Sequence, residues 1–247
     1  MKTALFSLVA LSLLASVAHA QQDPYPLPPK EWPKPVMDTE PHPMLLLDLL
    51  EYRSRAGKDA WVWEGEAWFG GDYNKLWIKS EGESEIRGST ASADLQALYA
   101  RRIAPFWYLQ AGVRQEMRPR PVRNQGVLAV QGLAPYWFNV QASAFIGDGG
   151  LSGRLEAEYD QLLTQRLILQ PRVETNFAGS SNAARGVGSG INDVELGLRL
   201  RYEIRREFAP YVGVTWTRKV GDTADLARQQ GHDVKDTAIV LGLRAWY

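Results

Sequence analysis

The sequence predicts an all-β membrane protein, a transmembrane antiparallel β-barrel of about twelve strands with a short proline-rich N-terminal arm. Apolar and polar residues alternate along most of the chain, as in strands with one face in lipid and the other in a polar lumen. The chain ends on the aromatic Tyr247, without a polar tail. The predicted connections are short at one end of the strands and long at the other, as outer-membrane barrels require.

The closing strand, Asp236 to Tyr247, carries this pattern most clearly. Every second residue from Ile239 to Tyr247 is apolar, whereas the opposite face includes Arg244. A packed soluble core would accept that arginine only at a high cost in free energy. A final strand that ends in an aromatic residue also resembles the C-terminal signal by which bacterial outer-membrane barrels are recognised for insertion.

Composition excludes several classes of function. The 247 residues contain 28 Lys+Arg and 28 Asp+Glu, so no net charge points to nucleic acid, and we expect no such partner. The mean hydropathy is −0.29. The 9 Trp and 10 Tyr suit aromatic rings at both membrane interfaces. The absence of Cys excludes disulfides, thiolate metal sites, a Cys nucleophile and a lipoprotein anchor.

Three segments are expected along the chain: a signal peptide over 1–20, a periplasmic arm over 21–43 and a barrel over 44–247. Lys2, the apolar stretch from Ala4 and the small-x-small site ending at Ala20 indicate export, although a short membrane anchor is the alternative. The arm is rich in proline, which cannot occupy a central strand.

Within the barrel, each strand is expected where the period of two is regular, and the even count places both chain ends in the periplasm. Asp48 breaks the alternation of the first strand, which predicts either a bulge or an irregular start of that strand. Pro171 is awkward inside the ninth. The expected strands cover about 44–53, 60–70, 73–85, 89–102, 106–116, 125–133, 138–144, 151–159, 167–177, 194–202, 208–218 and 236–247.

The connections give an independent check. The two longest predicted loops, 178–190 and 219–235, both fall on the outer side. An apolar-Ala-Pro-aromatic sequence recurs from Ile103, Leu133 and Phe208, each time at a predicted periplasmic turn that the proline would fix, although chance recurrence of a common turn sequence is the alternative. A soluble β-sandwich would explain the alternation equally well, but not the signal peptide, terminal aromatic and loop asymmetry together.

Charged residues are predicted on the lumenal face. They could guide small ions, or they could fill a closed lumen as ion pairs, and we favour filling. The acidic wall comprises Glu64, Glu66, Glu81, Glu83, Glu85 and Asp94, and the arginines are Arg154, Arg172, Arg199, Arg201 and Arg244.

Several ordered stretches resemble the copper-resistance protein B family (CopB, with its plasmid relative PcoB). They include MLLLDLLEYR from Met44, GGDYNKLWIKSEGE from Gly70, RLEAEYDQLLTQRLILQPR from Arg154 and the closing VLGLRAWY, within a resemblance that covers about 35–247. The resemblance implies a Gram-negative outer-membrane protein that confers copper tolerance by binding copper ions and sequestering or exporting them. A periplasmic copper carrier is then a candidate partner.

One departure from the family concerns the arm. Many members carry a Met- and His-rich segment ahead of the barrel, whereas this arm offers only Met37, His42 and Met44 as copper ligands. Thioether with imidazole is a reasonable transient copper site, and these three residues are the metal-site candidates. The alternative is that Met44 only begins a strand and His42 is an exposed linker residue.

Other side chains carry weaker hypotheses. His232 lies in a long outer loop, where a lone histidine is usually just solvated. The loop RPRPVR, with Arg118, Arg120 and Arg123, could contact lipopolysaccharide phosphates or simply be solvated. No enzyme is expected, because HExxH, GxSxG and P-loop patterns are absent and neither remaining histidine has a recognisable Ser partner. The rival functions are a narrow general small-solute pore and a structural outer-membrane barrel without a metal role.

Overall fold

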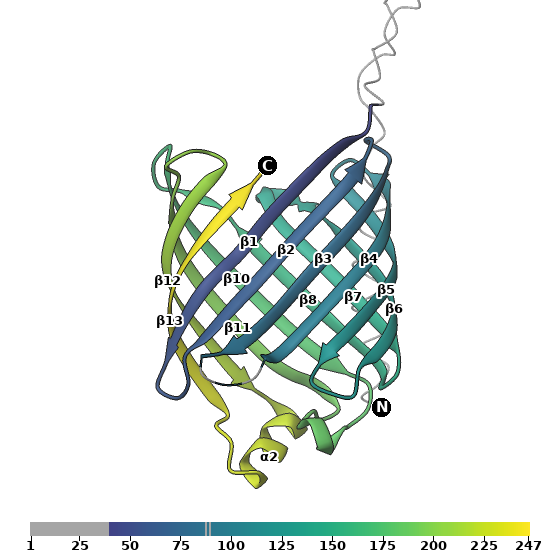
Figure 1. Cartoon of the computed structure of the whole chain (residues 1–247), viewed down its shortest axis with the longest axis vertical. Helices are drawn as coiled ribbons and strands as arrows, with labels where there is room; N and C mark the ends of the chain where they lie inside the picture. Colours follow the sequence, from purple (N-terminus) through teal and green to yellow (C-terminus); the bar gives the residue numbers. More distant parts are fainter. Residues whose placement is uncertain (1–39, 87, 89) are drawn as a thin grey trace, which may run out of the picture. The chain divides into compact units, whose positions relative to one another are not determined.

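A computed structural model describes residues 40–86, 88 and 90–247. The predicted signal peptide and most of the predicted arm, Met37 included, lie outside the described residues. The described chain forms a closed antiparallel β-barrel (Figure 1). Its single sheet has 13 strands, of which β9 has only 2 residues, so the barrel wall is built from the twelve long strands that were predicted.

The strands follow one another around the barrel in chain order, apart from the short β9. The strands are β1 (His42–Arg55), β2 (Ala60–Gly70), β3 (Asn74–Glu85), β4 (Thr90–Ala104), β5 (Trp107–Arg118), β6 (Arg123–Ala134), β7 (Phe138–Gly147), β8 (Gly150–Tyr159), β9 (Gln161–Leu162), β10 (Leu167–Ala178), β11 (Gly190–Tyr202), β12 (Phe208–Lys219) and β13 (Lys235–Trp246). The helical pieces are η1 (Pro135–Trp137), η2 (Ala183–Arg185) and α2 (Gly221–Gln229).

Closure of the barrel depends on the pairing of β1 with β13. At the end of this seam, Leu45 and Tyr247 exchange two backbone hydrogen bonds of 2.8 Å each. Pairing of the first and last strands removes both open edges of the sheet, so no row of backbone donors and acceptors is left unpaired in lipid.

The two faces of β13 differ as predicted. Ile239 and Leu241 expose 65% and 63% of their surface on the outside, where lipid replaces water, while Val240 on the inner face is fully buried. The same division holds on β4, where Leu95 is exposed and Asp94 is buried. The period of two therefore assigned the lipid-facing and lumenal sides correctly.

The predicted bulge at Asp48 is confirmed. Leu47 pairs with Gly65 of β2 and Leu49 pairs with Glu64, so Asp48 is the extra residue of β1. The bulge reverses the phase of β1: Leu46 lines the lumen before it, and Glu51 is buried inside the barrel after it.

Pro171 interrupts the ladder on one side of β10. Its neighbours pair in a single register, with Leu169 opposite Gln161 and Arg172 opposite Glu158. Gln170 and Pro171, which lie between these two pairs, have no partner on this side of β10. This gap separates β8 from β9. Because proline has no N–H to donate, the strand that would accept from it ends early.

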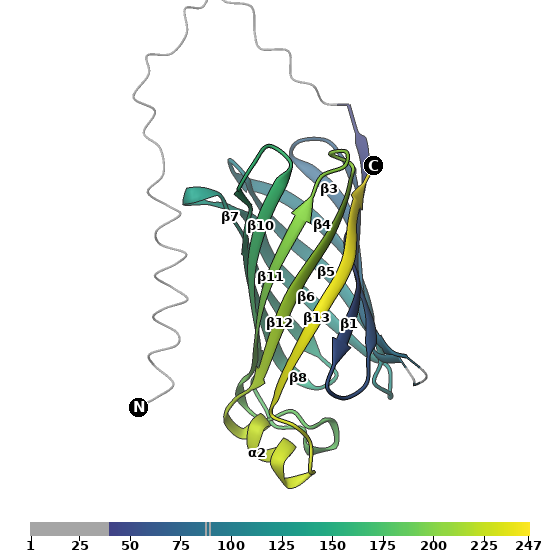
Figure 2. The same cartoon turned by 90° about the vertical axis from the view of Figure 1, so that its left-hand side faces the viewer.

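The connections have the predicted asymmetry. The two long loops, 179–189 and 220–234, lie at one end of the barrel, and the C-terminus lies at the other (Figure 2). The last long loop contains α2, a helix that the sequence pattern did not predict. Among residues 40–86, 88 and 90–247, no helix is long and apolar enough to cross a bilayer.

The repeated Ala-Pro sequence was only partly interpreted correctly. Pro105 and Pro135 follow the ends of β4 and β6 and lie in turns, as predicted. Pro210 instead lies within β12, opposite Leu243 of β13. The turn there is made by 203–207, so this third copy is a strand sequence, and its resemblance to the other two is not structural.

Exposed aromatic residues surround the short-turn end. Phe106, Tyr136, Trp137 and Tyr247 all present most of their surface to the outside. Aromatic rings of this kind are enriched at the headgroup level of a bilayer, where the apolar acyl chains meet the polar headgroups. The turns therefore mark one membrane interface.

Candidate functional site

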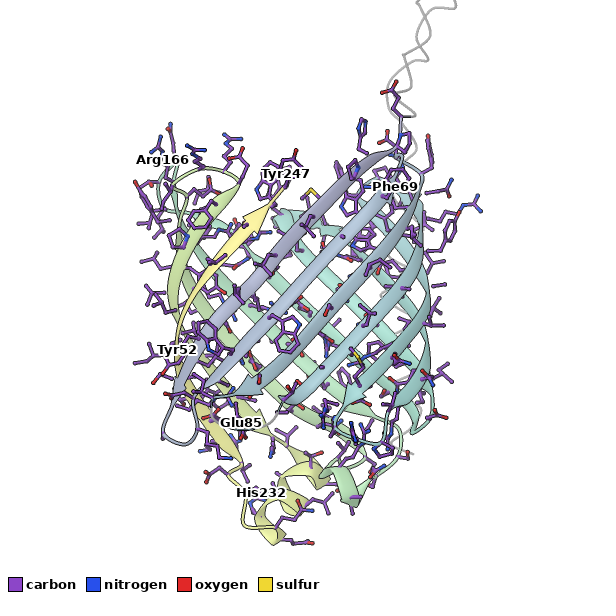
Figure 3. The ribbon with its side chains drawn as sticks, in the orientation of Figure 1. Tyr52, Phe69, Glu85, Arg166, His232 and Tyr247 are labelled. Atoms are coloured by element: carbon purple, nitrogen blue, oxygen red, sulfur yellow. The ribbon has the colours of Figure 1, made fainter. Side chains whose placement is uncertain are left out.

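Two of the three predicted metal ligands lie at the beginning of β1. His42 pairs with Gly70 and Met44 pairs with Trp68, and the register is continuous from there to Leu47. Residues two apart share a face, so both point to the same side as Leu46, which lines the lumen. His42 is exposed and Met44 half-buried. Pro43, between them, pairs with Phe69, and Leu45, next to Met44, pairs with Tyr247. Phe69 and Tyr247 mark the short-turn end in Figure 3.

His232 lies at the opposite end of the barrel, in the loop that follows α2 (Figure 3). The two histidines of the barrel are therefore not brought together. No group of three or more His, Cys, Asp or Glu side chains in the described part of the chain is arranged to hold a metal ion.

Beside Met44, three rings lie close to the ammonium group of Lys75. We call Trp68, Trp77 and Tyr108 the aromatic cage. The Lys75 Nζ atom lies 3.7 Å from the ring centroid of Trp68, 4.9 Å from that of Tyr108 and 5.9 Å from that of Trp77. Trp77 is buried and packs on the apolar cluster around Leu98. The sequence analysis missed this cage, although Trp68, Lys75 and Trp77 all have lumenal parity in one hairpin.

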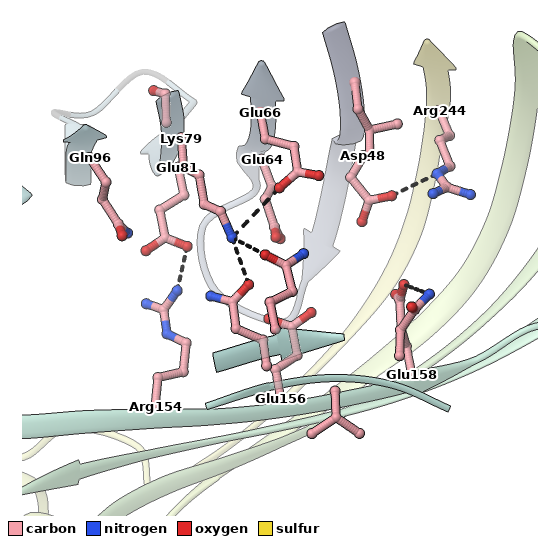
Figure 4. A pocket seen from close by; sticks show the side chains of 17 residues that line it. Asp48, Glu64, Glu66, Lys79, Glu81, Gln96, Arg154, Glu156, Glu158 and Arg244 are labelled. Atoms are coloured by element: carbon pink, nitrogen blue, oxygen red, sulfur yellow. Dashed lines mark hydrogen bonds and ion pairs between the residues drawn. The ribbon is translucent and has the colours of Figure 1, made fainter. Parts of the chain in front are cut away.

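Below the cage, the lumen is crossed by ion pairs (Figure 4). Arg172 of β10 places its Nη2 atom 2.7 Å from Glu64 of β2 and 2.9 Å from Glu156 of β8. Arg154 of β8 binds Glu81 of β3. β10 and β2 are not neighbours in the sheet, and neither are β8 and β3, so these pairs connect opposite walls of the barrel. The predicted pairing of lumenal acids with arginines is confirmed.

A cavity of about 200 Å³ lies among these pairs. Its lining contains the six carboxylates of Asp48, Glu64, Glu66, Glu81, Glu156 and Glu158 and only three basic groups, those of Lys79, Arg154 and Arg244. The bulge residue Asp48 contributes by binding Arg244 at 2.7 Å. Arg172, which is outside this lining, also neutralises Glu64 and Glu156, so the carboxylates around the space outnumber the basic groups by less than the lining alone indicates.

A second charged cluster lies closer to the long loops. Glu51 is fully buried and accepts from Arg53 at 2.7 Å, from Arg199 at 3.1 Å and from the Tyr211 hydroxyl at 3.1 Å. Arg53 in turn pairs with Glu195 at 3.0 Å. Glu51 was missed as a lumenal residue because the bulge shifts its phase.

The long loops are fastened to one another. Arg185 in the loop 179–189 pairs with Glu116 at 2.7 Å and donates to the carbonyls of Pro119 and Pro121 at 2.8 and 2.9 Å. Thr223 of α2 accepts from the Gly188 N–H at 2.8 Å. The loop that carries Arg118, Arg120 and Arg123 is therefore held by its backbone, and its proposed contact with lipopolysaccharide stays a prediction.

The loop between β1 and β2 is held by hydrogen bonds to Asp59. The Tyr52 hydroxyl donates to the Asp59 carboxylate at 2.5 Å, and the Arg55 N–H donates to the same carboxylate at 3.2 Å. These bonds, that from Tyr52 first, hold the pKa of Asp59 below its ordinary value because they favour the charged carboxylate.

A closed barrel with an apolar outer surface, aromatic rings at one rim and a charged interior defines an outer-membrane β-barrel of a Gram-negative bacterium. The chain belongs to the copper resistance protein B family: the model described as copper resistance protein B precursor (CopB) matches residues 42–247.

Two curated relatives agree with this assignment. Copper resistance protein B of Escherichia coli is 44% identical over 205 residues, which cover 83% of this chain and 69% of the relative. The copper resistance protein B homolog of Pseudomonas syringae pv. tomato is 44% identical over 213 residues, covering 86% and 72%. Among solved structures, the NanC porin is similar with a TM-score of 0.52 at 13% identity, covering 81% of this chain and 98% of that one. This last likeness concerns the fold alone.

Proposed function

We propose that this protein confers copper tolerance by binding copper ions at the periplasmic mouth of the barrel and handing them on, for sequestration or export. Membership of the copper resistance protein B family points to copper. The proposed position of the copper site is supported by one observation: His42 and Met44 lie on the same lumenal face at the beginning of β1. The role is binding and transfer, and no reaction is required.

The short-turn end is assigned to the periplasm because outer-membrane barrels have short periplasmic turns and long outer loops. His42 and Met44 then face the compartment from which copper must be removed. Imidazole and thioether are both copper ligands. Two such ligands do not complete the coordination of either Cu(I) or Cu(II), so the ion would bind transiently. Met37, seven residues before Met44, is the proposed third ligand.

A soluble periplasmic copper carrier is the proposed partner at this mouth. Two ligands at an open rim leave coordination positions free, and a second protein could supply or take the ion there through ligands of its own. Transfer by ligand exchange needs no gate at the rim, and it would make the barrel one step in a chain of copper-binding proteins.

The test compares copper tolerance of cells that lack the protein, cells with it restored, and cells that carry His42→Ala/Met44→Ala. Loss of the protein should sensitise cells to copper but not to other divalent metals, and the double variant should reproduce the loss. His232→Ala is the matched control, because it removes an imidazole at the opposite end. Unchanged copper tolerance on loss of the protein, with altered uptake of small solutes, would instead favour a general pore.

A further inference from the structure

The aromatic cage holds a cation in the structure, the ammonium group of the protein's own Lys75. Its Nζ atom is closest to Trp68, at 3.7 Å from the ring centroid. Trp68 and Trp77 lie 6.3 Å apart and Trp77 and Tyr108 6.0 Å apart, measured between ring centroids, with the ring planes inclined by 54° and 74°. The three rings therefore form one contiguous cluster. Faces of Trp and Tyr rings attract cations through their quadrupole, and Trp does so best.

Met44 lies directly across from the cage. It pairs with Trp68 in an uninterrupted part of the β1–β2 ladder, and both residues belong to the lumenal face. Side chains of such directly opposed residues have Cβ atoms about 4.5–5.5 Å apart and contact one another. A thioether and the ring type best suited to a cation therefore occupy directly opposed positions on the lumenal face.

We propose that Met44 and the aromatic cage form a binding site for a soft monovalent cation, Cu(I), in which the ion takes the place of the Lys75 ammonium over Trp68. The thioether supplies a soft ligand and the indole face supplies a cation–π contact. Lys75 has a flexible four-carbon stem and can leave toward the water at the rim. The ion keeps its oxidation state, so no electron acceptor is needed. The site rests on the proposed function, since Met44 serves both.

The cage lies next to the charged part of the lumen. Lys79, two residues after Trp77 on the same face of β3, lies 5.5 Å from the Trp77 ring centroid and 3.6 Å from the Glu66 carboxylate. Both Lys79 and Glu66 line the acidic cavity. The site therefore lies between the rim and the acidic cavity, and the Lys79 ammonium group, paired with Glu66, is the first charge on its inner side. Lys75 in place would repel a bound cation.

The experiment measures Ag(I) binding to the purified full-length protein in detergent micelles, in chloride-free buffer, because Ag(I) is a soft monovalent ion that does not change oxidation state. Dissociation constants come from calorimetry. Trp68→Leu should weaken binding about tenfold, and Trp68→Phe, which keeps a poorer ring, by less. Lys75→Gln should tighten binding about threefold or more by removing the competing charge, whereas Lys75→Arg should not. Trp61→Leu, at the other end of β2, is the control and should change nothing.

The outcomes separate this inference from the function on which it rests. Ag(I) binding that needs Met44 but is unaffected by Trp68→Phe, Trp68→Leu and Lys75→Gln overturns the aromatic site and leaves copper binding at the mouth intact. Ag(I) and copper binding that are both unaffected by His42→Ala/Met44→Ala overturn the proposed function itself. Lys75→Gln carries the test even where Trp68→Leu fails to fold, since Lys75 is not part of the buried apolar cluster.

Discussion

Arg172 of β10 and Glu64 of β2 are 108 positions apart in the chain, yet their side chains meet at 2.7 Å in the middle of the lumen. The Arg172 side chain is only 8% exposed and also contacts Glu156 at 2.9 Å. One guanidinium group therefore connects two opposite walls of the barrel. The interior is occupied by such connections, with a small acidic cavity between them.

This bridge predicts the conductance of the protein. In planar lipid bilayers, the wild-type protein should show no steady open channel, because cross-lumen ion pairs occupy the path that a solute would take. A steady conductance that passes small sugars or amino acids would contradict this expectation and would favour the rival function of a general small-solute pore.

Removal of the bridge should open the lumen to cations. Arg172→Ala leaves Glu64 and Glu156 without their shared partner, and the widened path is then lined by excess carboxylates. We expect stepwise channel openings with reversal potentials that favour K⁺ over Cl⁻ in a KCl gradient. Arg228→Ala removes a partner of an exposed ion pair on α2 and is the control. Anion selectivity in Arg172→Ala would be incompatible with the acidic lining.

Glu51 should contribute strongly to stability. Glu51→Ala leaves Arg199 and Arg53 buried without their shared carboxylate, and breaking such a buried pair costs about 3–5 kcal/mol of the free energy of unfolding. Urea titration of the protein in micelles measures the loss. Glu85→Ala is the matched control, because its partner Lys58 is exposed and such a surface pair is worth about 0–1 kcal/mol. Equal losses for the two variants would show that the buried cluster is not special.

The close approach of β4 and β5 should make Gly112 sensitive to any side chain. A Cβ atom on Gly112 would lie 2.0 Å from the Ala97 carbonyl oxygen, so the strands must separate to admit it. We expect Gly112→Ala to cost about 1–3 kcal/mol and to reduce the fraction of protein that refolds into micelles. Gly126→Ala, where the nearest atom is 3.6 Å away, should behave like the wild type. Normal refolding of Gly112→Ala would argue against this close approach.

The sequence allowed the wall of the barrel to be predicted, because a strand in a barrel has only two faces and a period of two distinguishes them. The closing strand, the bulge at Asp48 and the positions of the long loops were all anticipated in this way. Pro210 was misjudged because a turn sequence and a strand sequence can share the same three residues. The helix α2 was missed because a long loop was treated as irregular throughout.

The partners inside the lumen could not be predicted. Periodicity showed that Glu64 and Arg172 face inward, but which residue lies across the lumen depends on strand tilt and stagger, which one strand does not reveal. The aromatic cage was missed for the same reason, since Tyr108 joins Trp68 and Trp77 from a strand further along the chain. To predict that Glu51 faces the lumen, one must know that the bulge at Asp48 reverses the alternation of β1.

The most direct test of the account is the one-to-one copper affinity of the purified protein. We predict that His42→Ala/Met44→Ala weakens this affinity by more than about tenfold, as is usual when groups that support a metal are removed. His232→Ala, which alters the only other histidine of the barrel, should leave the affinity unchanged. A copper affinity that is the same in the wild type and in the double variant would contradict the claim that the mouth of the barrel binds copper.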